Sequence, residues 1–263
     1  MRSKFFPRGA AAFLILACAL AGPSRLPAAG SPAESNPQGI ELAAHLRSLQ
    51  PGENSELAGA LNVKHGRGRP VEKIPVVCRV TVRANGWDTS YETSDTPAQG
   101  AQKLVIHHFL NEPSTYLYAT AAVGQPLPGL KLVSREKLDT PFAGSDFSID
   151  ELGLEFLFWP GQFRLKGEMR LGQPCYVLES RDGSGRRVKS WLDKESVEQN
   201  NPGLLVAESY DARNVMVKEF NLGGSSFKKI HGQWQLEKMK IRSPKQGSET
   251  TLKFDLSEGK KTP

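Results

Sequence analysis

The chain has 263 residues, with 34 lysines and arginines against 28 aspartates and glutamates and a formal net charge of +6. The first 30 residues hold four of the basic residues and no acidic one. The rest of the chain therefore carries 30 basic and 28 acidic residues, a net charge of +2. Because charges of both signs are interspersed along it, they form no basic surface for DNA or RNA. This charge pattern excludes nucleic acid as a partner.

Residues 1–30 have the three parts of a secretory signal. A basic start with Arg2, Lys4 and Arg8 precedes an apolar run from Ala10 to Ala21, and small residues end the segment at Ala28-Ala29-Gly30. The run of about 12 residues is shorter than the roughly 20 that a membrane-spanning helix needs. We therefore expect residues 1–30 to be a signal peptide that directs export and is removed.

The three cysteines leave two questions open. Cys18 follows the small residue Ala17, so it could instead be a lipoprotein cleavage site that anchors the mature protein through lipid. Cys78 and Cys175 could form a disulfide in an oxidising compartment, or they could be small buried residues on strands. Neither lies in a CxxC or Cys/His spacing typical of zinc, and we expect no metal.

The chain beyond the signal predicts one mainly β domain. We expect a single domain at residues 40–257, preceded by a flexible leader at 31–39 and followed by a tail at 258–263. The domain should begin with a short amphipathic helix at 40–49, which Pro51-Gly52 ends. Short runs rich in β-branched and aromatic residues, separated by turn residues, indicate an antiparallel barrel or sandwich. We expect strands near 55–64, 72–83, 87–93, 102–110, 115–121, 162–169, 174–181, 187–193, 204–210, 214–221, 226–231, 234–242 and 249–256.

Two segments interrupt this strand pattern. Ser148 followed by Asp150 and Glu151 is typical of a helix start, and the apolar residues that follow predict a helix to Trp159 that covers the sheet. The candidate cover residues in it are Leu152, Phe156, Phe158 and Trp159. Residues 124–142 are rich in proline and glycine, hold a possible strand around 130–133, and predict a lid-like or rim loop.

Catalytic motifs are missing from the sequence. It contains no GxSxG nucleophile elbow, no phosphate-binding GxxxxGK[ST] loop and no GxGxxG after a strand. His107 and His108 are adjacent on a predicted strand and should point to opposite faces, so they cannot share one metal ion. We expect no enzymatic activity, no catalytic residue and no cofactor.

Alternation along the later strands defines one apolar face, which either packs as an ordinary core or lines a ligand cavity. The candidate lining residues are Tyr176, Leu178, Val188, Leu192, Leu204, Val206, Val215, Val217, Trp234, Leu236, Leu252 and Phe254. The opposite parity, which we expect in water, carries Lys189, Asp193, Lys218, Glu237, Lys253 and Asp255. Acyl chains would suit such a cavity, because each buried CH₂ contributes about 0.8 kcal/mol.

A series of short motifs resembles the LolA-like outer-membrane lipoprotein-sorting family in order and spacing over about residues 50–257. The matching segments are FAGSDFS at 142–148, DEL at 150–152, GQPCYVLES at 172–180, VKSWLDKE at 188–195, KIHGQWQLEKM at 229–239 and GSETTL at 247–252. The resemblance implies an unclosed, half β-barrel curled over a few α-helices. Its apolar inner face would receive lipoprotein acyl chains in the periplasm. Carriers of this family tie their cover closed with basic residues, which these motifs do not locate in this chain.

We therefore expect a monomeric periplasmic carrier of lipid or lipoprotein acyl chains, acting in outer-membrane sorting. Two alternatives stay open. One is a sensor or interaction module of the same fold that regulates an envelope protein partner. The other is a membrane-anchored lipoprotein acceptor, which requires lipid on Cys18.

Overall fold

The computed structural model describes residues 35–110, 112–200, 202–223, 226–230 and 233–256. The predicted signal segment with Cys18 and the predicted tail lie outside these residues. The strands are β1 (Ser55–His65), β2 (Val71–Arg83), β3 (Gly86–Thr93), β4 (Gln102–Phe109), β5 (Thr115–Thr120), β6 (Lys131–Leu132), β7 (Gly161–Arg170), β8 (Gln173–Arg181), β9 (Arg187–Asp193), β10 (Leu204–Tyr210), β11 (Met216–Asn221), β12 (Phe227–Ile230), β13 (Gln233–Leu236), β14 (Lys238–Ser243) and β15 (Ser248–Phe254). The helices are α1 (Pro37–Arg47), α2 (Ile149–Leu152) and α3 (Lys194–Glu198), with 3₁₀ turns η1 (Arg135–Lys137), η2 (Phe142–Gly144) and η3 (Glu155–Phe158).

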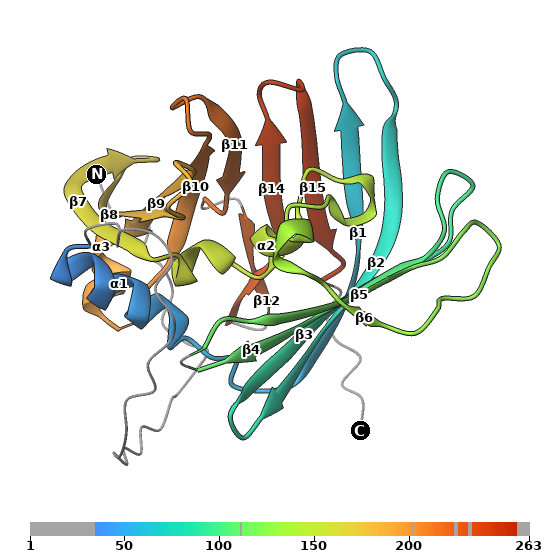
Figure 1. The fold of residues 1–263 in the computed structure, drawn as a ribbon, viewed down its shortest axis with the longest axis horizontal. Helices are drawn as coiled ribbons and strands as arrows, with labels where there is room; N and C mark the ends of the chain where they lie inside the picture. Colours follow the sequence, from blue (N-terminus) through green and yellow to red (C-terminus); the bar gives the residue numbers. More distant parts are fainter. Residues whose placement is uncertain (1–34, 111, 201, 224–225, 231–232, 257–263) are drawn as a thin grey trace.

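Thirteen strands form one antiparallel sheet in the order β6-β5-β4-β3-β2-β1-β15-β14-β11-β10-β9-β8-β7. Neighbouring strands are mostly neighbours in sequence, and the first and last strands meet in the middle, where Gly59 pairs with Phe254. The two ends, β6 and β7, are not paired with each other, so the sheet curves without closing (Figure 1). The predicted fold class, a mainly β, unclosed half-barrel over a few helices, is confirmed.

Helix α1 begins earlier than predicted, and part of the expected flexible leader is ordered. The Asn36 side chain accepts a hydrogen bond from the Gly39 backbone N–H at 2.7 Å, and Pro37 occupies the first helical position. Leu42 and Ala43 are buried against the inner face of the sheet. The prediction missed the start because it relied on the apolar period, which begins only inside the helix.

The predicted single helix from Ser148 to Trp159 is wrong, because the segment forms two short helical pieces, α2 and η3. Glu151 accepts a hydrogen bond from the Ser148 backbone N–H at 2.8 Å, so the predicted start is correct. Leu154 then adopts a left-handed conformation with φ of 52°, which breaks the helix. The segment still lies within the curve of the sheet, as Figure 1 shows for α2.

The motif at 142–148 fixes this covering segment to the sheet. Buried Asp146 accepts hydrogen bonds from the hydroxyls of Thr250 (2.8 Å) and Ser248 on β15, and its own backbone N–H donates to Thr250 at 2.9 Å. Phe142 and Phe147 on either side are 1% and 2% exposed. The motif therefore places two aromatic anchors and one buried carboxylate against the middle of the sheet.

Two buried clusters fill the inner side of the sheet. One lies under β1–β5, β14 and β15 and includes Phe142, Phe147 and Ile149 from the cover. The other lies under β8–β10 and includes Phe156 and Leu157 of η3 together with α1. A smaller cluster of Cys175, Val177, Trp191, Leu205 and Val206 is separate from both.

The remaining differences from the predicted strands are local. The strand expected at 234–242 is two strands, because Glu237 ends β13, which pairs with β12, before β14 joins the main sheet. Cys78 and Cys175 are buried free thiols in different clusters, not a disulfide. This matches the interpretation of them as small buried strand residues.

We predict that Asp146→Ala lowers the free energy of unfolding by roughly 2–4 kcal/mol, since it removes a buried carboxylate that accepts two hydroxyl hydrogen bonds. Exposed Asp139 on the same segment is the control, and Asp139→Ala should change the value by less than about 0.5 kcal/mol. Urea denaturation measures both. Equal stability of the two variants would show that Asp146 does not anchor the cover.

Candidate functional site

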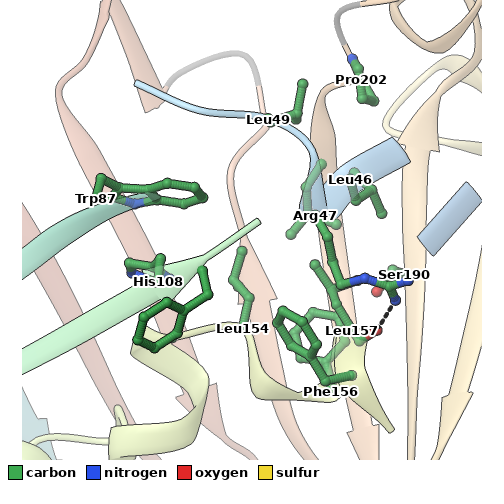
Figure 2. A pocket seen from close by; sticks show the side chains of 14 residues that line it. Leu46, Arg47, Leu49, Trp87, His108, Leu154, Phe156, Leu157, Ser190 and Pro202 are labelled. Carbon is green, nitrogen blue, oxygen red and sulfur yellow. Dashed lines mark hydrogen bonds between the residues drawn. The ribbon is translucent and has the colours of Figure 1, made fainter. Parts of the chain in front are cut away.

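An apolar cleft of about 200 Å³ lies between the end of α1, the η3 segment and the strands β3, β4, β9 and β10. Figure 2 shows Trp87 and His108 on one side and Leu46 and Arg47 of α1 on the other. Its lining residues are Leu46, Arg47, Leu49, Trp87, His108, Phe109, Gly153, Leu154, Phe156, Leu157, Phe158, Ser190, Pro202 and Leu204. Most of them are apolar or aromatic, so the cleft suits a hydrocarbon ligand.

An aromatic wall forms one side of the cleft. Trp87 and His108, which pair across β3 and β4, stack with ring centroids 4.7 Å apart at an interplanar angle of 14°. His108 Nδ1 lies 3.2 Å from Ser114 Oγ, and burial lowers the pKa of His108 to about 4. The imidazole is therefore neutral near pH 7, and this wall carries no charge. Because adjacent residues on a strand point to opposite faces, His107 points away from the cleft, where it contacts Asp88.

Arg47 joins α1 to the cover at the opposite side of the cleft. Its Nη1 donates a hydrogen bond to the Leu157 carbonyl oxygen at 2.6 Å, and its guanidinium lies 5.3 Å from the Phe158 ring centroid. Desolvation by burial lowers the pKa of Arg47. A guanidinium nevertheless keeps its proton in proteins, so the cleft contains one fixed positive charge.

The two ends of α1 are attached differently. At its start, the Asn36 side-chain amide donates a hydrogen bond to the Arg164 carbonyl oxygen of the edge strand β7 and accepts one from the Arg164 N–H. These are the two hydrogen bonds that a neighbouring strand would make with Arg164. Gly39 lies so close to β7 that an added Cβ would be 2.5 Å from the Gln162 carbonyl oxygen. At its end, Arg47 supplies the one hydrogen bond from α1 to η3 among the described residues. The start of the helix is therefore anchored to β7 by hydrogen bonds, whereas its end is held to η3 by apolar packing, the Phe158 ring contact and a single hydrogen bond.

Leu154 sits at the break between α2 and η3 and lines the cleft. A bulky residue with φ of 52° is a conformational outlier, and this one is also 37% exposed. Such strain persists only where the surrounding structure imposes it, and it concentrates at functional sites. The break therefore exposes an apolar side chain to the cleft instead of burying it in the sheet.

Most of the predicted lining residues face the inner side of the sheet but are packed in its core. Leu178, Val188 and Leu192 are buried in the cluster under β8–β10, and Tyr176 packs at its margin. Leu252 and Phe254 are buried in the other cluster, and Leu236 packs against it. Of the predicted lining residues, Leu204 alone lines the cleft. The covering segment fills the space that the alternation pattern left open.

The predicted face is inverted on β11. Phe220 packs against both inner clusters, and Lys218, expected in water, forms an ion pair with Glu151 of the cover at 2.8 Å. Alternation then places Val217 on the opposite face, and Val215 is 49% exposed. The half-buried Glu151, a pairing partner that alternation cannot reveal, explains why a charged residue faces inward.

Two further predicted positions differ. Val206 belongs to the separate cluster with Trp191, because an irregular register between Leu204 and Val206 shifts the alternation of β10. Trp234 lies on β13 outside the main sheet, and its side chain is outside the described part of the structure.

The predicted cover residues divide between the two inner clusters. Phe156 and Phe158 line the cleft, Leu152 packs against the cluster under β1–β5, and Trp159 packs beside η3, with Arg186 above its ring. The predicted loop at 124–142 begins at the β5–β6 edge and is not part of the cleft lining. The sequence did not predict Trp87, His108, Phe109 and Pro202 as lining residues, because they lie on β3, on β4 and before β10, and no common pattern of apolar residues links them.

Within the described residues, no group of three or more histidine, cysteine or acidic side chains is placed to hold a metal ion. In the same part of the chain, the helices are too short or too polar to cross a bilayer. The chemistry that the site offers is therefore apolar contact, the guanidinium of Arg47, the hydroxyl of Ser190 and the imidazole of His108.

Three solved structures have similar folds and are distant in sequence. They include a proposed outer membrane lipoprotein-sorting protein domain from Vibrio parahaemolyticus (20% identity, TM-score 0.64) and a DUF1329 family protein from Desulfovibrio piger (18%, 0.63), each matching 83% of this chain and 90% of its own. A LolA superfamily protein from Nitrosomonas europaea (14%, 0.55) matches over 86% of this chain and 94% of its own. The chain thus has the LolA-like fold.

One family model, described as "uncharacterized protein", matches residues 98–261. This is more than half of the 263 residues, and the chain belongs to that family. The curated proteins contain no match to the sequence.

We predict that His108 makes the fold sensitive to acid. In the unfolded chain it takes up a proton near pH 6.5, but in the fold only near pH 4, so the unfolded state binds more protons between these values. The free energy of unfolding should fall, by on the order of 2–3 kcal/mol from this group, as the pH drops through that window. His108→Asn should lose this part of the fall, measured by urea denaturation at several pH values. Parallel curves for both proteins would contradict the prediction.

Proposed function

We propose that this protein is a non-enzymatic carrier that binds lipid acyl chains in the periplasm. The observation that carries the proposal is the apolar cleft between the sheet and its cover, walled by Trp87, Phe109, Leu154 and Phe156. A hydrocarbon chain in such a cleft gains about 0.8 kcal/mol for each buried CH₂, and the polar groups at the site offer no catalytic constellation.

The small volume of the cleft supports the interpretation that this structure is the closed state of such a carrier. A dry cavity of about 150 Å³ is enough to bind benzene, so 200 Å³ holds only a short part of an acyl chain. A longer chain needs more room, which the asymmetric attachment of α1 can supply. If the Arg47–Leu157 contact breaks while Asn36 and Gly39 stay on β7, the end of α1 moves away from η3.

Arg47 then has the role that basic residues have in the carriers this sequence resembles, because it ties the cover closed. Its bond to a backbone carbonyl is a reversible latch: it stabilises the closed state modestly, by about 1.5–3 kcal/mol for a charged donor. Binding of an acyl chain of several CH₂ groups can offset that amount.

The cellular role follows from the resemblance and the fold together. The signal-like segment at residues 1–30 suits export, and two of the similar structures are described as lipoprotein-sorting or LolA superfamily proteins. We therefore infer that the cargo is the acyl part of lipoproteins on its way to the outer membrane, handled by a monomer.

We predict that Leu46→Asp weakens binding of a fluorescent fatty acid at least tenfold, since it places a charge in the cleft wall. Ile40→Asp on the same helix is the matched control, because Ile40 is 50% exposed and is not a lining residue, and its affinity should stay within about twofold. Fluorescence titration of both folded variants and the parent protein measures the difference.

Two results would count against the carrier. Equal affinities of the Leu46 and Ile40 variants would place the ligand elsewhere. A parent protein that takes up no fatty acid, but retains an envelope protein in a pull-down, would favour the interaction module instead.

A further inference from the structure

The cleft is not apolar throughout, because two hydrogen-bonding side chains line it on the side away from Trp87 and His108. Ser190 and Arg47 both line it, and in Figure 2 the Arg47 guanidinium and Ser190 project to the same end. Trp87 and Leu154 lie away from this end. A ligand that fills the cleft therefore meets hydrocarbon and aromatic groups along one part and hydrogen-bond donors at another.

Ser190 has an unfulfilled hydrogen-bonding capacity. Its side chain is 0% exposed, and its Oγ has no hydrogen-bond partner among the described residues. A buried hydroxyl without a partner costs about as much as a lost hydrogen bond, so native structures rarely keep one without a reason. Ser190 lies on β9 between Lys189 and Trp191, and its strand neighbours Leu178 and Ala207 are apolar. No neighbouring strand residue therefore supplies the missing partner.

Arg47 lacks a counter-ion at the same place. Its guanidinium makes one hydrogen bond, to the Leu157 carbonyl oxygen, and no ion pair within the described residues. The acid on η3, Glu155, accepts a hydrogen bond from the Tyr116 hydroxyl at 2.9 Å. A guanidinium has five N–H donors, and the bond to Leu157 uses only one of them, so Arg47 has donors left for a ligand.

We propose that this polar end binds the carboxylate of a single-chain amphiphile, whose hydrocarbon tail lies along the aromatic wall of the cleft. The proposal rests on the proposed function, binding of an acyl chain in the cleft, and adds a ligand class to it: free chains that end in a carboxylate, beside the ester- and amide-linked chains of lipoproteins. Arg47 supplies the charge that a carboxylate needs, and Ser190 supplies a hydroxyl donor. An alcohol or ester of equal length satisfies the hydroxyl but leaves the guanidinium without an anion.

The test compares three ligands with the same tail: dodecanoate, dodecanol and methyl dodecanoate. Each is titrated into the delipidated protein by calorimetry near neutral pH, dodecanoate below its critical micelle concentration and the other two below their solubility limits. The parent protein should bind dodecanoate at least about tenfold more tightly than the other two, which is the ratio expected for a partly buried charged hydrogen bond. Equal affinities for all three would overturn the proposal but leave the carrier standing. Binding of none of them would overturn the carrier as well.

Variants separate the two polar groups. Arg47→Gln should reduce the preference for dodecanoate over dodecanol to within about threefold, whereas Arg213→Gln, in an exposed turn, should leave it unchanged. Ser190→Ala should weaken dodecanoate several-fold. Because it removes a hydroxyl that has no partner, it should leave the ligand-free protein as stable as the parent or more so.

The free energy of unfolding of Ser190→Ala shows whether weaker binding has a structural cause. Weaker binding together with a stable ligand-free protein assigns Ser190 to the ligand. A marked loss of stability, or unchanged affinity for dodecanoate, would mean that the hydroxyl serves the fold and would overturn its place in the site. If Arg47→Gln does not fold, the three-ligand comparison on the parent protein still decides the proposal.

Discussion

The fold depends on how the apolar inner face of an open sheet is covered. A 13-stranded antiparallel sheet that does not close has one face of apolar side chains that must be kept from water, and its own strands cannot do this. The segment from Leu138 to Phe158 does it, and the buried carboxylate of Asp146 fixes that segment to β15. The edge of β7 is also covered, because the Asn36 side-chain amide makes hydrogen bonds with the backbone of this strand.

A cover made of several short pieces leaves an apolar cleft between them. Because Leu154 breaks the cover into two short helical pieces, the pieces cannot pack over the whole inner face, and α1 closes the remainder. The cleft lies where these three parts meet. Its position explains why one residue, Arg47, can both close the cover and face a ligand, and why the strain at Leu154 is found there.

The sequence predicts the sheet well and the cleft poorly, for physical reasons. Strands follow from alternation and turn residues, which are local, and the start of α2 follows from the capping preference of Ser148. The break has one local signal, Gly153 at the C-terminal end of α2, but the left-handed conformation of Leu154 has none, since leucine normally continues a helix. The inward Lys218 depends on Glu151, a partner 67 residues away, and Trp87, Ser190 and Pro202 come together only through the strand order.

Native mass spectrometry of the protein purified from a Gram-negative periplasm, with lipid extraction of the same sample, shows whether the cleft carries an acyl chain. A carrier should co-purify with an acylated species that is reduced in the Leu46→Asp protein and retained in the Ile40→Asp protein. Parent protein that is free of any acylated species, and stays free after incubation with lipid, would show that the protein is not an acyl-chain carrier.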